Sequence, residues 1–247
     1  MEIPTGRWGF VNNFLWYALM PVGLHINNSS SSASVQIDSD AHNLRLVASG
    51  SIHVTKFNRS NNTNDTPPIQ VAGDSPLLFL GPASGHVAVI RRSQEGGVWN
   101  FYLATGPWED VTVEYYIFDR RTPVAGSYGL QVFTASGELA FDSNDKHLRL
   151  AGIYPGNSNV TGLPTGKTYA TCLSFPTVGF YTFTDTPFYQ SYLLFSSTRV
   201  LGTTVEIDAS EVGIAPFEAE QEADATTFYE AQKLNNSRIL IADVTGF

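Results

Sequence analysis

Cysteine, positive charge and long apolar runs are all scarce in this sequence. Of the 247 residues only Cys172 is a cysteine, so no disulfide can form within the chain and disulfide-stapled folds are excluded. Lys and Arg number 14 against 23 Asp and Glu, which leaves a formal net charge of −9. Binding to nucleic acid or anionic lipid requires basic side chains, so we expect neither partner. No apolar run approaches the roughly 20 residues of a membrane-spanning helix, so we expect no membrane span.

The usual sequence signatures of catalysis are missing as well. There is no Gly-x-Ser-x-Gly elbow for a nucleophilic serine. Residues 162–168, GLPTGKT, resemble a phosphate-binding loop, but the glycine spacing is short and Pro164 lacks a backbone donor. Cys172 lies in an apolar, strand-like setting, where thiols are usually inert. No pair of carboxylates stands out for glycoside hydrolysis, so a polysaccharide-degrading enzyme is only a third hypothesis and we predict no enzymatic activity.

Candidate metal ligands show no recognisable spacing. Asp38 with Asp40, and Asp142 with Asn144 and Asp145, carry oxygens that Ca²⁺ accepts, but both segments lack the glycine and distal glutamate of an EF-hand. Polar turns of this composition form for backbone reasons alone. The histidines have no zinc-site spacing; they are His25, His42, His53, His86 and His147. We therefore expect no metal and no organic cofactor.

The residues that are abundant favour β-structure. Aromatic residues make up 13% of the chain and charged residues only 15%, while 21 Gly and 13 Pro separate short apolar stretches. The strongest strand candidate is VTVEYYIF at 111–118, which is rich in β-branched and aromatic residues. The best helix candidate lies at 216–234, and 238–244 is a strand candidate. We predict an all-β fold of sandwich-like antiparallel sheets with at most one short C-terminal helix.

A duplicated motif organises the chain. Residues 128–150, YGLQVFTASGELAFDSNDKHLRL, alternate apolar and polar positions on both sides of a turn at 135–137, which predicts a β-hairpin. The ordered set GL, DS and LRL also occurs earlier, at 23–46. Matching positions keep a constant separation except across the first turn, which is two residues longer, as expected for a duplicated hairpin. We therefore predict two units, 1–125 and 126–247, each beginning with one copy of the motif.

Aromatic residues form two further groups of interest. Those near the start predict either a core strand or an arm that docks on a neighbouring subunit; they are Trp8, Phe10, Phe14, Trp16 and Tyr17. A second group offers surfaces for a glycan-binding platform, although such residues also occur as ordinary strand-core aromatics; it includes Trp99, Tyr102 and Trp108.

The motif regions resemble a family of tail-associated proteins of tailed bacteriophages and prophages. The resemblance rests on GLHINN…VQIDSD…LRLVASG, on YGLQVFTASGELAFDSNDKHLRL, and on the V-x-V-x-Y-x-x-F-D pattern at 111–119. The first copy departs from the family pattern, because a polar segment at 27–34 replaces the Ser-Gly turn. The segment that follows Leu150 is not covered by the resemblance.

The resemblance implies a structural role in the virion, at the tail tip, baseplate or fibre attachment, without catalytic residues. Its implied partners are other phage tail proteins and further copies of the same chain, which would meet through the aromatic N-terminal segment or the C-terminal strand. The implied location is the virion tail, assembled in the host cytoplasm. The alternative expectation is a module that binds a host receptor or glycan on the cell surface.

Overall fold

The computed structural model describes most of the chain, and all of its regular elements are β-strands. The described residues are 23–27, 34–38, 44–58, 63–120, 129–133, 136–137, 139–174, 178–185, 188–215 and 238–247. Nearly all strand pairings among them are antiparallel, and they contain no helix. The predicted all-β fold is confirmed, whereas the helix candidate at 216–234 lies outside the described residues.

The chain divides into two units, each built from two separate stretches of sequence. The hairpin unit comprises Met1–Asn43 and Thr122–Asn144, and the sheet unit comprises Leu44–Arg121 and Asp145–Phe247. This differs from the predicted division between residues 125 and 126. The physical reason is that strands from both halves of the chain hydrogen-bond within one large sheet, which leaves the two hairpins as a separate unit.

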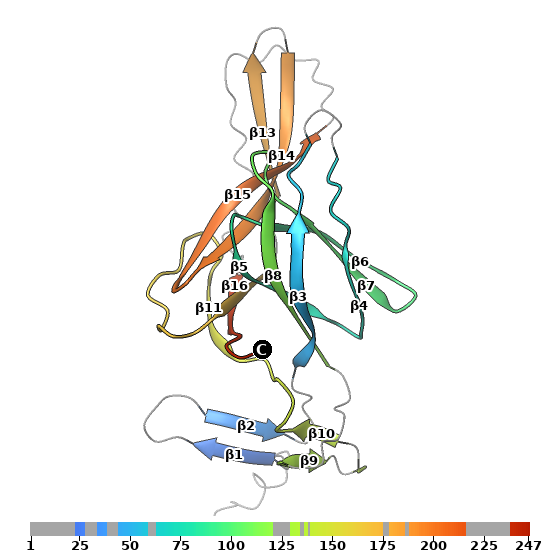
Figure 1. Cartoon of the computed structure of the whole chain (residues 1–247), viewed down its shortest axis with the longest axis vertical. Coiled ribbons are helices and arrows are strands. Elements are labelled where there is room, and N and C mark those ends of the chain that lie inside the picture. Colours follow the sequence, from blue (N-terminus) through green and yellow to red (C-terminus); the bar gives the residue numbers. More distant parts are fainter. Residues whose placement is uncertain are drawn as a thin grey trace, which may run out of the picture. The chain divides into compact units, whose positions relative to one another are not determined.

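Both predicted hairpins are present in the hairpin unit (Figure 1). The first pairs β1 (Gly23–Asn27) with β2 (Ser34–Asp38), and the second pairs β9 (Gln131–Phe133) with β10 (Leu139–Asp142). Gly137 has a φ of 83°, a left-handed conformation that glycine adopts without steric cost, and it lies in the second turn. The duplicated hairpin is therefore confirmed at the level of strand pairing.

The sheet unit contains a nine-stranded and a three-stranded sheet (Figure 1). The larger sheet has the order β11-β16-β12-β5-β14-β13, with β15 paired to β14 and with β8 joining β5 to β3. Its strands are β3 (Arg45–Val54), β5 (Leu77–Ala83), β8 (Val111–Asp119), β11 (Leu150–Pro155), β12 (Tyr169–Leu173), β13 (Val178–Asp185), β14 (Phe188–Leu201), β15 (Thr204–Ala215) and β16 (Arg238–Asp243). The smaller sheet has the order β4-β7-β6, from β4 (Ile69–Ala72), β6 (Ala88–Glu95) and β7 (Val98–Ala104).

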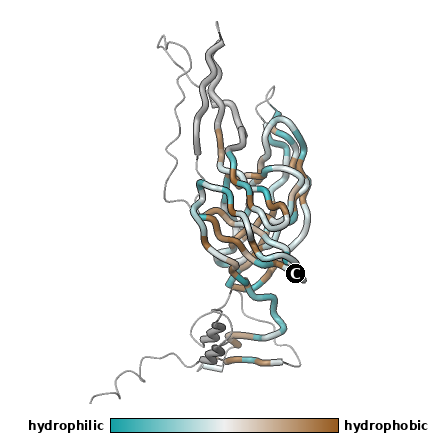
Figure 2. Tube along the Cα trace, turned by 90° about the vertical axis from the view of Figure 1, so that its left-hand side faces the viewer, coloured by the Kyte–Doolittle hydropathy of each residue, from teal (hydrophilic) through white to brown (hydrophobic). Residues whose placement is uncertain are grey.

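The core of the sheet unit lies on both faces of its central strands. On β8, Val113 and Ile117 belong to a cluster shared with the three-stranded sheet, whereas Tyr116 and Phe118 belong to a cluster shared with β12 and β16. This alternation follows from the two-residue repeat of a strand. Hydrophobic positions accordingly recur along the strands of this unit (Figure 2). β8, the segment with the strongest β-propensity in the sequence, is thus a central strand with buried residues on both faces.

The first LRL segment, residues 44–46, lies antiparallel to residues 146–148, which lead into the second LRL segment of the sheet unit. The Leu46 amide donates to the Lys146 carbonyl at 2.8 Å, and the Leu148 amide donates to the Leu44 carbonyl, also at 2.8 Å. The bridge pairs Arg45 with His147, so Leu148 is the only residue of the second LRL segment that takes part in this pairing. The first LRL segment thus lies beside the residues just before the second one, where β3 begins and ahead of β11.

Candidate functional site

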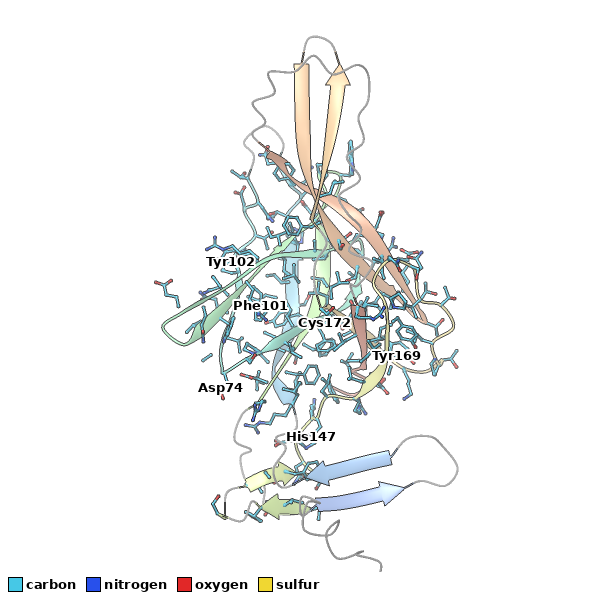
Figure 3. The ribbon with its side chains drawn as sticks, turned by 180° about the vertical axis from the view of Figure 1, so that it is seen from behind. Asp74, Phe101, Tyr102, His147, Tyr169 and Cys172 are labelled. Atoms are coloured by element: carbon cyan, nitrogen blue, oxygen red, sulfur yellow. The ribbon has the colours of Figure 1, made fainter. Side chains whose placement is uncertain are left out.

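The structure separates the three aromatics predicted as a glycan platform. Trp99 packs against the core cluster on the inner face of the three-stranded sheet, and its Nε1 donates to the Gly73 carbonyl at 3.1 Å. Tyr102, labelled in Figure 3, lies three residues further along β7, on the opposite face of the strand. It lines a different, shallow hollow together with Arg91. Trp108 borders neither the core cluster that contains Trp99 nor the hollow beside Tyr102. The three side chains therefore do not form one platform.

Trp108 is the member of this group that remains available to a ligand. Its side chain is 78% exposed, in the loop that leads from β7 to β8. It borders a hollow of about 510 Å³ together with Lys56, Asp65 and Asp110. The Asp110 carboxylate accepts from the Lys56 amide at 2.8 Å, which fixes one polar wall. An exposed indole beside ordered carboxylates is a surface that can stack on a sugar ring and hydrogen-bond its hydroxyls.

The Asp-Ser pair of the duplicated motif has a clear local role in the second hairpin. Asp142 is fully buried, and its carboxylate accepts from the Asn144 amide at 2.8 Å and from Gln131 Nε2 at 2.9 Å. Ser143 Oγ accepts from the Leu130 amide at 2.9 Å. These bonds close the polar turn and tie it to β9, as Asx side chains do in turns. No group of three or more metal-ligating side chains occurs among the described residues.

The second hairpin also exposes apolar side chains that the sequence analysis did not single out. Phe133 is 51% exposed and Leu130 is 44% exposed. Large exposed apolar groups on a small unit are typical of surfaces that contact another protein. Strand alternation alone could not reveal them, because it does not say which face of a hairpin is covered.

The predicted interface residues Trp8, Phe10, Phe14, Trp16 and Tyr17 lie outside the described residues.

Residues 162–168 form a turn whose lysine is engaged within the fold. Lys167 Nζ donates to the Asp243 carboxylate at 2.6 Å, and Gly162 and Gly166 have φ values of 76° and 74°. Arg149, from the second LRL segment, lies 3.7 Å from the same carboxylate. The segment is therefore a surface turn held by an ion pair.

Cys172 is a poor nucleophile at neutral pH. Burial raises the pKa of its thiol to about 11, and the positive charge of Arg92 offsets this only in part. The thiolate is the reactive form of cysteine, so little of it exists near pH 7. This agrees with the inert role that the sequence suggested for the residue.

The candidate surfaces are thus a set of exposed aromatic and aliphatic side chains. They include Trp108 with its hollow and the pair Leu150 and Ile153 on β11 in the sheet unit, and Leu130 with Phe133 in the hairpin unit. Within the part of the chain that the structure describes, no helix has the length and apolar character needed to cross a membrane. Comparisons with protein-family models, with curated proteins and with solved structures found no match to this chain.

Proposed function

We propose that this protein is a non-enzymatic structural component of a bacteriophage tail tip or baseplate, where it joins other virion proteins. The sequence support is the GL, DS and LRL motif, which occurs twice and resembles tail-associated proteins. The geometric support is the hairpin unit, whose second hairpin carries the exposed Leu130 and Phe133. That exposed pair is the observation that carries the proposal.

The hairpin unit has open strand edges and little core of its own, so contact with a partner protein would stabilise it. Among the described residues each hairpin is a two-stranded sheet that pairs with no third strand. Isolated two-stranded hairpins are marginally stable in water, and unpaired edges readily accept a strand from another chain. Adding a strand or covering Phe133 would bury apolar surface and satisfy open backbone groups in one step. These requirements fit a protein that is stable in an assembly.

The sheet unit supplies the rigid part that such a role requires. β5 and β8 are buried on both faces, with Leu78 and Leu80 in one cluster and Phe79 in another. Side chains packed this closely resist deformation. The homo-oligomer and the location in the virion tail belong to the same proposal, because tail assemblies are built from symmetric copies.

The test of this proposal is whether the protein is found in tail particles and depends on the second hairpin to be there. Purified tailed particles from the source should contain the chain by mass spectrometry, cross-linked to other tail proteins. Phe133→Asp should lower its incorporation at least about tenfold, because a charge cannot be buried unpaired in an apolar contact. Gln94→Asp, at an exposed polar position of β6 in the sheet unit, is the control and should assemble normally.

Two results would reject the structural role. One is the absence of the chain from particles that carry complete tails. The other is a Phe133→Asp variant that folds, by circular dichroism, and enters particles as well as the control. A monomeric protein that binds no tail component would point in the same direction.

Binding of a host-surface glycan is the second candidate function, favoured by the exposure of Trp108. On an array of bacterial surface glycans, Trp108→Ala should reduce binding about five- to tenfold, since stacking on an indole contributes about 1–1.5 kcal/mol. Tyr102→Ala, which removes an aromatic from a different hollow, should bind as the wild type does. Equal binding by both variants, or none by the wild type, would eliminate this candidate.

A further inference from the structure

An apolar cleft in the sheet unit serves neither of the proposed functions. It has a volume of about 510 Å³ and lies between β6 and β7 of the smaller sheet and β5, β12, β14 and β16 of the larger one. This volume falls in the range of about 300–1,000 Å³ that small-molecule sites occupy. Its wall is mainly aliphatic and includes Leu77, Leu80, Val87, Val89, Leu173 and Leu240.

The neutral polar side chains in the wall are already hydrogen-bonded within the fold. Thr171 Oγ1 lies 3.0 Å from Thr198 Oγ1 and donates to the Leu80 carbonyl at 3.3 Å. Ser174 Oγ accepts from the Arg238 amide at 3.0 Å. With these groups paired to one another, the floor of the cleft presents an apolar surface to a ligand.

The charge of the cleft is opposite to that of the whole chain. Its lining contains Arg91 and Arg92 but no Asp or Glu, in a chain of formal net charge −9. Arg92 lies opposite Phe101 in the pairing of β6 with β7, which places it on the same face of the sheet as this core aromatic. Among the described residues no carboxylate forms an ion pair with either arginine.

The guanidinium of Arg92 is oriented by an aromatic ring and keeps its donors. Its central carbon lies 4.9 Å from the centroid of the Trp99 ring. A stacked guanidinium retains its in-plane N–H groups, which match the two oxygens of a carboxylate. An exposed arginine held in this way at the opening of an apolar cleft is a recognition group for an anion.

We propose that the cleft binds an amphipathic anion, a molecule with a single alkyl chain that ends in a carboxylate. The alkyl chain lies among the aliphatic side chains of both sheets, and the carboxylate pairs with Arg92. Apolar burial supplies the affinity, and the charge selects the ligand class. This inference is independent of the assembly role, because the cleft and the hairpin unit share no residue.

The position of Arg92 also has an explanation that involves no ligand: its charge would keep β6 from pairing with strands of other chains. β6 is an edge strand of the three-stranded sheet, and inward-pointing charges prevent edge strands from pairing with other chains. If Arg92 served only this purpose, its replacement would promote aggregation without changing the affinity for an amphiphile. The two explanations therefore predict different binding data.

The main experiment compares a charged and a neutral ligand of equal chain length. Sodium decanoate and decan-1-ol, below their aggregation limits, are titrated calorimetrically into the full chain. Wild-type protein should bind decanoate at least about tenfold more tightly than decan-1-ol. Arg92→Gln should remove this tenfold preference, equivalent to about 1.4 kcal/mol, while Arg120→Gln, which removes an exposed arginine outside the cleft, should retain it.

Cys172 provides an independent measurement, because this single cysteine lines the cleft. At about pH 9, where more of the thiolate is present than at neutral pH, saturating decanoate should slow alkylation of Cys172 by N-ethylmaleimide several-fold in folded protein, as followed by mass spectrometry. An unchanged alkylation rate, equal affinity for both ligands, or an Arg92→Gln variant that behaves like Arg120→Gln would overturn the proposal.

Discussion

At the scale of the residue, Asp119 shows how one buried carboxylate shapes a turn. Its side chain is fully buried and accepts from the amides of Asp74, Ser75 and Arg120 at 2.7 to 3.0 Å. Gly73 allows this approach, because a Cβ at that position would collide with the carboxylate. The acid that ends the V-x-V-x-Y-x-x-F-D pattern is thus required by the backbone of a neighbouring turn.

Asp243 should make the folded state sensitive to acid. Burial by itself would raise the pKa of this carboxyl, but hydrogen bonds from Lys167 and Thr245 and the charge of Arg149 outweigh it. The pKa is therefore lowered from 3.8 to about 2. Folding favours the carboxylate, so its contribution is complete above about pH 4 and is lost as the pH falls toward 2.

Urea unfolding at several pH values tests this prediction with the Asp243→Asn variant. At pH 7 the variant should be less stable by about 1–3 kcal/mol, because the Lys167 ammonium loses its charged partner. Its stability should also fall less steeply than that of the wild type between pH 4 and pH 2. Asp74→Asn, at an exposed carboxylate, serves as the control. Parallel pH profiles for Asp243→Asn and wild type would contradict the assignment.

At the scale of the element, β8 is the strand on which the sheet unit depends. It pairs with β3 on one side and β5 on the other, and residues from both of its faces are buried. Strong β-propensity and a doubly buried position coincide here, because β-branched and aromatic side chains fill a pleated, enclosed surface well. Replacing a core residue on β8 should therefore be costly.

Ile117→Ala should destabilise the protein by about 2–5 kcal/mol, because the fully buried side chain would leave a cavity between two packed sheets. Chemical denaturation gives the difference in the free energy of unfolding. Thr112→Ala, at an exposed position on the same strand, should change stability by less than about 0.5 kcal/mol. Similar values for the two variants would show that β8 is not part of the cooperative core.

The arginines at the centre of the two LRL segments make different contacts in the folded protein. Arg149 Nη2 donates to the Thr245 carbonyl at 2.6 Å, and its guanidinium lies 4.4 Å from the Phe247 ring centroid. Arg45, in the first copy, instead pairs with Asp145 at 3.1 Å. The two arginines occupy equivalent positions in the repeat but have different partners. The sequence repeat has arginine at both positions, and the surrounding strands determine its contacts.

At the scale of the whole molecule, stability should be distributed unequally between the two units. Buried clusters from several strands hold the sheet unit together, whereas each hairpin has only its own two strands among the described residues. Hydrogen exchange should therefore be slowest in β5, β8, β12 and β16 and faster by orders of magnitude in β1, β2, β9 and β10.

Exchange followed by mass spectrometry measures this difference directly. In isolated protein the hairpin amides should exchange without global unfolding, and incorporation into tail particles should slow them, because the partner would cover their edges. Equal protection of both units in the isolated chain would show that the hairpins belong to the same cooperative unit as the large sheet.

The sequence by itself determined the all-β class, the two hairpins and the strand at residues 111–118. Each of these follows from local signals: two-residue alternation, turn residues and β-propensity, which act over a few neighbouring positions. It also indicated that the DS turn is a backbone feature, since Asx side chains bond their own turn.

Only the tertiary structure decided which strands share a sheet and which side chains share a surface. The predicted boundary between 125 and 126 did not match the two units, because strand pairing depends on contacts between distant segments that no local pattern encodes. Trp99 and Tyr102 lie on opposite faces because they are three residues apart on one strand, but only the packing of the two sheets placed Arg92 beside an apolar cleft. Periodicity assigns a side chain to a face, but packing between sheets decides what that face meets.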